Sequence, residues 1–394
     1  MKEICVVSGT RAEYGLMRPL MRAIKGSPNL DLQLLATGTH LSKQHGATVH
    51  EIERDGFVID RRVPILTESD SETDIAGAFG RAVSGIASAL ADLDPDVVVL
   101  LGDRHETLAA GVAAMICRKP IAHIHGGEVT TGVIDEAIRH SLTKMSHLHF
   151  VSAERYRQRV LQLGEHPDRV WCTGAVGLDG ISELDLLPKE QLEIELGVRF
   201  SAMNFLVTFH PVTLLPRSAQ PDTQELIAAL DQFPDSTVIA TMPNAESESS
   251  DIAGSMREWA KLNPERVHVF ESLGQLRYLS TLRMCDVVIG NSSSGLIEAP
   301  AVGTPTVNIG DRQRGRLRGA SVFDVAAESD LIVEAIADAL TFSREADLTP
   351  FDSPYGAPGA SEVIAEVLEL CDTENLLIKD FVDWSGPTPY SEAP

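Results

Sequence analysis

The sequence predicts an α/β fold made of two doubly wound domains that face each other across a cleft. Short runs rich in Val and Ile recur along the chain, and each ends in Gly, Ser, Thr, Asp or His before a longer stretch with helical spacing. That alternation is typical of parallel sheets built from βα units. The length of 394 residues also favours two domains, because single domains average roughly 100–200 residues.

The predicted strands are short and mostly apolar. In the first half they are "EICVVSGT", "LDLQLLATG", "VVVLLGD", "PIAHIHGG", "HLHFVS" and "VWCTG". Residues 14–25, 72–92, 105–117, 134–146 and 153–163 have the spacing of helices. In the second half the strands are "FLVTFHP", "STVIATMP", "VHVFESL", "DVVIGNSS" and "PTVNIG". Open α/β sheets bind ligands outside the carboxyl ends of their strands, so we expect the site there.

The strand pattern stops after Gly180, where "ISELDLLPKEQLEIELGV" is typical of a linker with a helix. We therefore predict an N-terminal domain over residues 1–183 and a C-terminal domain over residues 184–358. One more amphipathic helix is expected over residues 359–372. A tail follows at 373–394, and its Pro-rich end is expected to fray.

Composition disfavours several classes of partner. A formal charge of −24, from 33 Lys and Arg against 57 Asp and Glu, argues against broad contact with nucleic acid or an anionic membrane. No apolar run approaches the roughly 20 residues that span a bilayer, and "MKEICVVSGT" does not read as a signal peptide. The cysteines form no CxxC pair, which indicates reduced core thiols in a cytoplasmic protein: Cys5, Cys117, Cys172, Cys285 and Cys371.

Two turns after predicted strands suit phosphate binding or acid–base chemistry. "SGTRAEYG" places Arg11 at a helix start, which suits a phosphate or is an ordinary turn with a surface arginine. It fits neither G-x-G-x-x-G nor a P-loop, which removes support for a dinucleotide or ATP. "LLGDRHE" places Asp103 and Arg104 directly before a helix, where Asp103 acts chemically or caps the helix.

The stretch "PIAHIHGGEVTTGVIDEAIRHS" is dense in histidines, acids and glycines. His123 and His125 stand two apart on a predicted strand and so share one face, and Glu128 with His140 would complete a metal site. The spacing matches no closed zinc pattern, so a proton-transfer site is favoured and no metal is expected. Asp135 begins the next helix, where its carboxylate suits the helix dipole or the chemistry.

The second half offers further polar strand ends. His210 in "FLVTFHPVT" is either a catalyst or a hydrogen-bonded core residue. "IGNSSSGLIEAP" enters a helix with hydroxyl and N–H groups that suit a phosphate or cap the helix. "IGDRQRGRLRG" concentrates positive charge, whose natural partner is a diphosphate, at Arg312, Arg314, Arg316 and Arg318.

Several of these motifs coincide with one family. "GTRAEYG", "GDRHETLAA", "HIHGGEVTTGVIDEAIRHSLTKMSHLHF", "TFHPVT", "MPNAES" and "GNSSSGLIEAPAVGTPTVNIGDRQRGR" together resemble the hydrolysing UDP-N-acetylglucosamine 2-epimerases of sialic and legionaminic acid synthesis. The resemblance runs in order from about Ile4 to Arg318. Motifs in a fixed order are far more specific than any one of them alone.

This resemblance implies a GT-B arrangement of two Rossmann-like domains, with the last helix crossing back to the first. It implies that UDP is eliminated across C-1 and C-2 of the sugar to leave a glycal. Water then adds, and C-2 is reprotonated from the other face. The products are N-acetylmannosamine and UDP, and neither a metal nor another cofactor is needed. We expect a nucleotide-sugar as ligand and a homo-oligomer, either a dimer or a tetramer.

The resemblance also implies roles for individual residues. The family's catalytic positions fall on Asp103, Asp135 and His210. Its UDP-binding positions, with the glutamate on the ribose and the others around the phosphates, fall on Arg11, Ser292, Ser293, Glu298 and Arg312. Asn244 resembles a ligand-facing position, and Arg104 beside Asp103 is a further candidate for substrate binding.

One motif departs from the family pattern. Many members read HIEGGE and use the first glutamate in catalysis, whereas this chain has His125 in its place. Either His125 or Glu128 then takes the acid–base role. One extra residue also separates Glu128 from Asp135, and both changes lie beside the sugar. The alternatives are therefore the same reaction on UDP- or GDP-N,N'-diacetylbacillosamine, a non-hydrolysing UDP-sugar 2-epimerase, or a GT-B glycosyltransferase.

Overall fold

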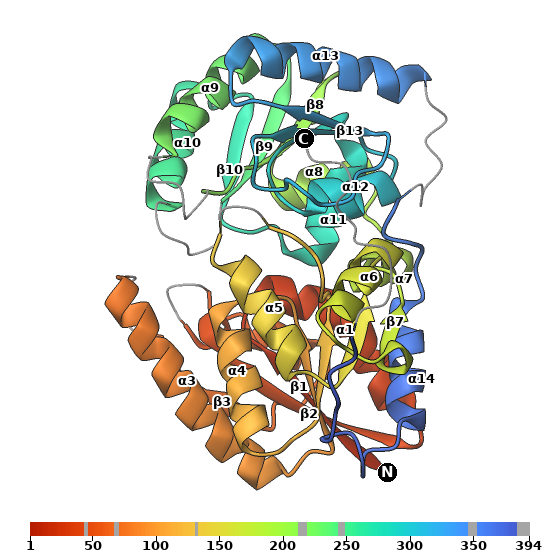
Figure 1. Ribbon diagram of the computed structural model, residues 1–394. Helices are drawn as coiled ribbons and strands as arrows, with labels where there is room; N and C mark the ends of the chain where they lie inside the picture. Colours follow the sequence, from red (N-terminus) through yellow and green to blue (C-terminus); the bar gives the residue numbers. More distant parts are fainter. Residues whose placement is uncertain are drawn as a thin grey trace.

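The computed structural model describes residues 1–42, 46–66, 71–130, 133–211, 219–242, 249–345 and 353–383. These residues form two parallel β-sheets, one above the other in Figure 1. The strand order is β3-β2-β1-β4-β5-β6-β7 in the first sheet and β10-β9-β8-β11-β12-β13 in the second. Each order reverses once, between β1 and β4 and between β8 and β11, which is the topology of a doubly wound domain. The predicted fold class is confirmed.

The first sheet and its helices come from the first half of the chain. Its strands are β1 (Lys2–Ser8), β2 (Leu30–Thr37), β3 (Arg61–Val63), β4 (Val97–Leu101), β5 (Ile121–Ile124), β6 (Leu148–Val151) and β7 (Val170–Cys172). The helices are α1 (Arg11–Gly26), α2 (Val49–Arg54), α3 (Glu72–Leu93), α4 (His105–Ile116), α5 (Asp135–Met145), α6 (Glu154–Gln162) and α7 (Asp179–Glu183).

The second sheet follows after α8 (Lys189–Leu196). Its strands are β8 (Asn204–Thr208), β9 (Thr237–Thr241), β10 (Val267–Phe270), β11 (Val287–Gly290), β12 (Thr306–Ile309) and β13 (Val322–Val325). The remaining helices are α9 (Gln220–Leu230), α10 (Ser249–Leu262), α11 (Gly274–Met284), α12 (Ser294–Ala301), α13 (Ser329–Glu345) and α14 (Ala360–Leu370).

Each sheet buries both faces, which explains the continuous apolar runs. Val97 and Val99 of β4 belong to the same hydrophobic cluster as Leu20 of α1. Val98, between them, belongs to the opposite cluster, with Ala109 of α4. Because strand side chains alternate between faces, a strand covered by helices on both sides must be apolar at every position.

The predicted helices of the first half are confirmed, but two strands were not predicted. β3 "RRV" and β13 "VFDV" are edge strands that pair only with β2 and β12, respectively. Their residues are largely half-exposed or exposed. An edge strand of this kind needs no apolar run, so hydrophobic pattern does not reveal it.

The prediction that the cysteines are core thiols is wrong for Cys172, which is exposed, while Cys5 and Cys285 are buried. Cys172 is the last residue of β7, which is the edge strand of the first sheet. No helix in the described segments combines the length and apolar composition needed to cross a membrane.

The last helix, α14, returns to the N-terminal domain and packs beside α1 (Figure 1). Ile364 and Leu368 of α14 belong to the same hydrophobic cluster as Leu20. The carboxylate of Asp179 accepts the backbone N–H groups of three residues at the start of α14, at 2.6, 3.2 and 2.7 Å: Gly359, Ala360 and Ser361. Asp179 therefore caps a helix from outside that helix's own sequence.

We expect Asp179→Asn to lower the free energy of unfolding by about 1–3 kcal/mol. Asparagine has one acceptor oxygen, so its NH2 group would face an N–H group that the carboxylate now accepts. Urea unfolding followed by circular dichroism measures the loss. Asp185→Asn is the matched control because Asp185 is exposed, and it should change stability by less than about 0.5 kcal/mol. Equal stabilities of the two variants would contradict the capping role.

Candidate active site

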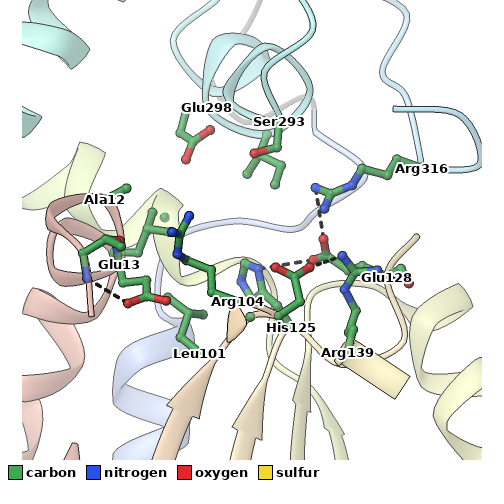
Figure 2. A pocket seen from close by; sticks show the side chains of 16 residues that line it. Ala12, Glu13, Leu101, Arg104, His125, Glu128, Arg139, Ser293, Glu298 and Arg316 are labelled. Atoms are coloured by element: carbon green, nitrogen blue, oxygen red, sulfur yellow. Dashed lines mark hydrogen bonds and ion pairs between the residues drawn. The ribbon is translucent and has the colours of Figure 1, made fainter. Parts of the chain in front are cut away.

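A cavity of about 170 Å³ lies between the two sheets (Figure 2). Segments that follow β1, β4 and β5 line it from the N-terminal domain, and segments that follow β11 and β12 line it from the C-terminal domain. The structure brings six of the predicted site residues into this lining: Asp103, Arg104, His125, Glu128, Ser293 and Glu298. Five others lie outside it: Arg11, Asp135, His210, Ser292 and Arg312.

His125 has an unusual backbone conformation. β5 ends at Ile124, and His125 has a φ of +66°, which is uncommon for a residue other than glycine and is often found at functional sites. The alternation of the strand stops before His125, so the prediction that His123 and His125 share one strand face is wrong. The Nδ1 atom of His125 lies 3.3 Å from Oε1 of Glu128.

Glu128 is buried but has a partner for each carboxylate oxygen. The hydroxyl of Ser152 donates to Oε1 at 2.7 Å, and Nη1 of Arg316 lies 3.1 Å from Oε2. Burial alone would raise the pKa of Glu128, but the charges of Arg316 and Arg139 and the hydrogen bond from Ser152 act together against burial and hold this pKa below its ordinary value. Glu128 is therefore ionised at neutral pH.

His125 is neutral at the same pH. Burial lowers its pKa below the ordinary value, although the charge of Glu128 opposes this shift. Nδ1 of His125 faces the carboxylate of Glu128, and a neutral imidazole protonated at Nδ1 has Nε2 as its acceptor. Nε2 is buried and has no hydrogen-bond partner among the described residues. His125 therefore brings an acceptor nitrogen without a protein partner to a residue of the cavity lining.

Asp103 is paired with Arg139, a site residue that the sequence analysis did not identify. Arg139 lies on α5 with its side chain only 1% exposed and forms an ion pair with Asp103. Burial would raise the pKa of Asp103, but Arg139 and Arg316 together hold it below its ordinary value. The alternative that Asp103 caps α4 is wrong, because the N-cap position is Arg104.

Arg139 also fixes the loop before its own helix. Its guanidinium donates to the backbone oxygen of Glu128 at 3.0 Å, to Thr130 Oγ1 at 2.7 Å and to Glu136 Oε2 at 2.8 Å. One feature of the sequence could have identified Arg139 as a site residue. It is an arginine on the inner face of a predicted helix, and a buried arginine needs acidic partners. Its partner Asp103 lies on another strand end, which only the fold brings near.

Two predicted catalytic residues, Asp135 and His210, do not line the cavity. Asp135 is the first residue of α5 and is half-exposed. His210 is buried, and hydrogen bonds of 2.7 and 2.8 Å tie its backbone to the side chain of Asn291. Burial, Arg312 and Arg104 of the opposite domain hold the pKa of His210 well below its ordinary value, so its ring is neutral.

The predicted nucleotide-binding residues gather around the start of α12. Ser293 is the N-cap residue of α12 and lines the cavity, as does Glu298 one turn later. Ser292 precedes them, with its hydroxyl 3.4 Å from the backbone nitrogen of Ser294. Arg312 donates to the backbone oxygen of Asn291 at 3.2 Å. A helix start beside an arginine suits a phosphate group.

The other predicted binding residues are less uniform. Arg104 lines the cavity and donates to Glu106 at 2.8 Å. Arg11 spans the domains instead, donating to Ser272 at 2.9 Å while it pairs with Glu51 at 2.8 Å. Asn244 lies outside the described residues.

The prediction that all four arginines of "IGDRQRGRLRG" face a diphosphate is wrong. Arg316 pairs with Glu128 across the cleft. Arg318 pairs with Asp324 at 2.5 Å within its own domain. These two charges already have carboxylate partners, which leaves Arg312 as the arginine that donates beside the α12 entry.

Glu13 is a further lining residue that sequence reasoning missed. Its carboxylate accepts the backbone N–H groups of Gly9 and Thr10 at 2.8 and 3.1 Å, as in a capping box. Burial and the neighbouring charge of Glu106 raise the pKa of Glu13 to about 7. The capping pattern was visible in the sequence, but the nearness of Glu106 was not.

The histidines considered for a metal are engaged elsewhere. Nε2 of His123 lies 2.8 Å from the backbone oxygen of Gly102, and Nε2 of His140 lies 3.2 Å from Oε1 of Glu136. Across the segments that the structure describes, no group of three or more His, Cys, Asp or Glu side chains is arranged to hold a metal ion.

Comparison with known proteins identifies the family of the chain. The family model described as UDP-N-acetylglucosamine 2-epimerase matches residues 22–369. A Campylobacter jejuni protein named GDP/UDP-N,N'-diacetylbacillosamine 2-epimerase (hydrolyzing) is 40% identical over 323 residues, covering 82% of this chain and 84% of the relative. An Escherichia coli protein named polysialic acid biosynthesis protein P7 is 36% identical over 385 residues, covering 97% of this chain and 98% of the relative.

A solved structure agrees at the level of the fold. UDP-GlcNAc 2-epimerase from Neisseria meningitidis, bound to UDP-GlcNAc, matches with a TM-score of 0.78 at 20% identity, covering 93% of this chain and 99% of that one. The two-sheet arrangement is thus of the GT-B type. The family model matches most of the chain. The two relatives are 40% and 36% identical and cover 82% and 97% of this chain, respectively. The chain therefore belongs to the UDP-N-acetylglucosamine 2-epimerase family.

Proposed function

We propose that this protein is a hydrolysing 2-epimerase that converts a UDP-linked 2-acetamido sugar into the free 2-epimer and UDP. The observation that carries the proposal is the pair formed by His125 and Glu128 in the cavity lining. An ionised carboxylate holds a neutral imidazole there, and Nε2 is left as an acceptor. A group of this kind can take a proton from carbon at neutral pH.

In the first step, His125 accepts the proton from C-2 of the sugar. The C–H electron pair becomes the double bond between C-1 and C-2, and the bond from C-1 to the diphosphate oxygen breaks. UDP leaves with that electron pair, and a glycal remains. Glu128 stabilises the imidazolium that forms, because an ionised carboxylate at 3.3 Å favours the charged ring.

In the second step, water adds at C-1 and C-2 takes a proton from the opposite face. We assign the activation of water to Asp103, which Arg139 and Arg316 keep ionised in the cavity lining. A base on one face and an acid on the other are required to invert C-2. Asp135, at the start of α5, is our candidate for the acid.

The departing diphosphate needs local positive charge in a chain with a formal charge of −24. We assign it to the start of α12 at Ser293, with Arg312 and Arg104 on its two sides. His210 lies close enough to both arginines for their charges to lower its pKa, which supports a role for His210 beside the same phosphates. Glu298 is then left for the ribose. Helix N-termini and arginines stabilise such developing charge.

We propose UDP-linked N,N'-diacetylbacillosamine as the preferred substrate and UDP-N-acetylglucosamine as the second candidate. The name and 40% identity of the Campylobacter jejuni relative support the first. The name of the Escherichia coli relative supports sialic-acid-type synthesis and so the second. His125 also replaces the glutamate of the commoner motif, which changes the pocket wall from charged to neutral beside the sugar.

Products followed by NMR test the reaction and its substrate. We expect both UDP-sugars to yield UDP and the free 2-epimer, with the larger kcat/KM for UDP-N,N'-diacetylbacillosamine. In heavy water the product should carry one deuterium at C-2, because reprotonation uses solvent. A product without deuterium would rule out the glycal route. Return of a UDP-linked epimer would indicate a non-hydrolysing enzyme, and no UDP release without an acceptor would indicate a transferase.

Substitution of His125 tests the proton acceptor. We expect His125→Ala to lower kcat by on the order of 10²-fold or more, the usual contribution of a general base. His125→Glu restores a carboxylate and should retain at least about tenfold more activity than the alanine variant. Unchanged melting temperatures would show that both variants fold.

The proposed mechanism also predicts how activity depends on pH. Burial lowers the pKa of His125, so wild-type activity should persist below pH 6.5 and disappear only as pH falls through the lowered pKa. An acidic limb centred above pH 6.5, or full activity in His125→Ala, would exclude His125 as the base.

UDP binding tests the diphosphate site. UDP should raise the melting temperature of the wild-type protein by mass action, and Arg312→Ala should abolish that shift. Arg314→Ala is the matched control, because Arg314 lies two residues away at an exposed position and should leave the shift intact. Protection by GDP but not by UDP at millimolar concentration would contradict the assignment of uracil as the base of the nucleotide.

A further inference from the structure

The loop between β12 and β13 reaches across the cleft to the other domain. The guanidinium of Arg316 makes three contacts there: Nη1 lies 3.1 Å from Oε2 of Glu128, Nε donates to Val129 O at 2.8 Å, and Nη2 donates to Thr130 Oγ1 at 3.1 Å. Figure 2 shows Arg316 extending from the C-terminal domain towards Glu128. One side chain thus holds three consecutive residues of the opposite domain.

The same loop is tied to the nucleotide side of the site. Arg312 and Gln313 both donate to the backbone oxygen of Asn291, at 3.2 and 2.8 Å. Asn291 in turn holds the backbone of His210. The loop therefore connects the α12 entry with the loop that carries Glu128.

The loop is also anchored beyond Arg316 by two tyrosines, Tyr156 of the N-terminal domain and Tyr355. The backbone nitrogen of Leu317 donates to the hydroxyl of Tyr156 at 3.0 Å. The hydroxyl of Tyr355 donates to the backbone oxygen of Leu317 at 3.0 Å. These two hydrogen bonds fix the backbone of the residue after Arg316 and so hold Arg316 beside Glu128.

The ion pair has lost most of its hydration. The side chains of Arg316 and Glu128 are 9% and 2% exposed. A buried pair of this kind differs from a surface salt bridge, because loss of one partner leaves an uncompensated charge. Only a guanidinium can serve a carboxylate, a carbonyl and a hydroxyl from one planar group, so lysine is a poor replacement.

We propose that Arg316 is a positioning residue that couples closure of the two domains to the readiness of the His125–Glu128 pair. This inference rests on the proposed function. In the closed form, Arg316 fixes the carboxylate of Glu128, and Glu128 fixes the tautomer of His125 that accepts a proton at Nε2. When the domains separate, Arg316 leaves with the C-terminal domain and the pair loses its orientation. Proton abstraction is then confined to the closed cleft.

Kinetics of Arg316→Gln test this role. We expect kcat to fall by on the order of 10²-fold, as for a misplaced catalytic group, while the UDP-induced rise in melting temperature remains. Arg316→Lys keeps the charge without the planar fork and should fall between the glutamine variant and the wild type. Arg314→Gln removes the same charge from an exposed position of the same loop and should keep wild-type kcat. Wild-type kcat in Arg316→Gln would overturn the proposal.

A double-mutant cycle shows whether Arg316 acts through Glu128. If it does, Arg316→Gln combined with Glu128→Gln should be no slower than Glu128→Gln alone. Fully additive losses would overturn the coupling.

The pH profile gives a readout that a merely structural role would not move. The charged and titratable groups around Glu128 and His125 are Arg139, Arg316, Tyr156, Tyr355, Asp103 and Glu298. Arg316 lowers the pKa of Glu128 and also that of His125, so its removal raises both. Activity that needs the deprotonated groups is then lost at higher pH, and the acidic limb should move up by about 1 pH unit in Arg316→Gln. An unmoved limb would overturn the proposal.

Hydrogen exchange separates this inference from the proposed function. Amides of residues 125–130 should exchange faster in Arg316→Gln than in Arg314→Gln, whether or not any substrate is turned over. Unchanged exchange would overturn the clamp. A wild-type protein inactive on every UDP- and GDP-sugar would overturn the proposed function, and the exchange result would still decide whether Arg316 holds the Glu128 loop.

Discussion

The buried ion pair between Arg316 and Glu128 joins two domains that share no β-strand. Burying two charges is unfavourable unless good geometry and further hydrogen bonds compensate. Here the hydroxyl of Ser152 donates a hydrogen bond to the carboxylate. The backbone oxygen of Val129 and the hydroxyl of Thr130 accept hydrogen bonds from the guanidinium. Loss of one partner would leave a buried charge, which typically costs about 3–5 kcal/mol. The geometry of the cleft therefore depends on both domains being in contact at this point.

The acidic groups of the site differ in pKa because they have different neighbours. Asp103 and Glu128 lie near arginines, which keep both ionised despite burial. Glu13 lies near the carboxylate of Glu106, and its pKa rises to about 7. Burial raises the pKa of each of these carboxyl groups, and the charge of the neighbours decides whether that rise remains or is reversed. The acidic overall composition of the chain does not prevent these local differences, because Arg139 and Arg316 are buried beside Asp103 and Glu128.

The topology places these groups together. In each domain the strand order reverses at the central pair of strands, and the loops there open towards the other domain. Gly290 ends β11 with a φ of +139°, and a Cβ atom added there would lie 2.0 Å from the backbone oxygen of Thr208. Only glycine permits this close approach, which directs the chain into the α12 entry at Ser293. His125 makes the corresponding turn after β5 with a left-handed backbone.

The sequence by itself determined the doubly wound architecture, most helices and the strand ends that carry Asp103, His125, Glu128 and Ser293. These follow from local hydrophobic period and from polar residues after apolar runs, which neighbouring residues decide. Only the tertiary structure decided that Arg316 serves Glu128 rather than a phosphate, that Arg139 holds Asp103, and that Glu13 lies beside Glu106. An arginine carries the same charge beside any anion, so its partner is fixed only when distant segments pack together and exclude water from between them.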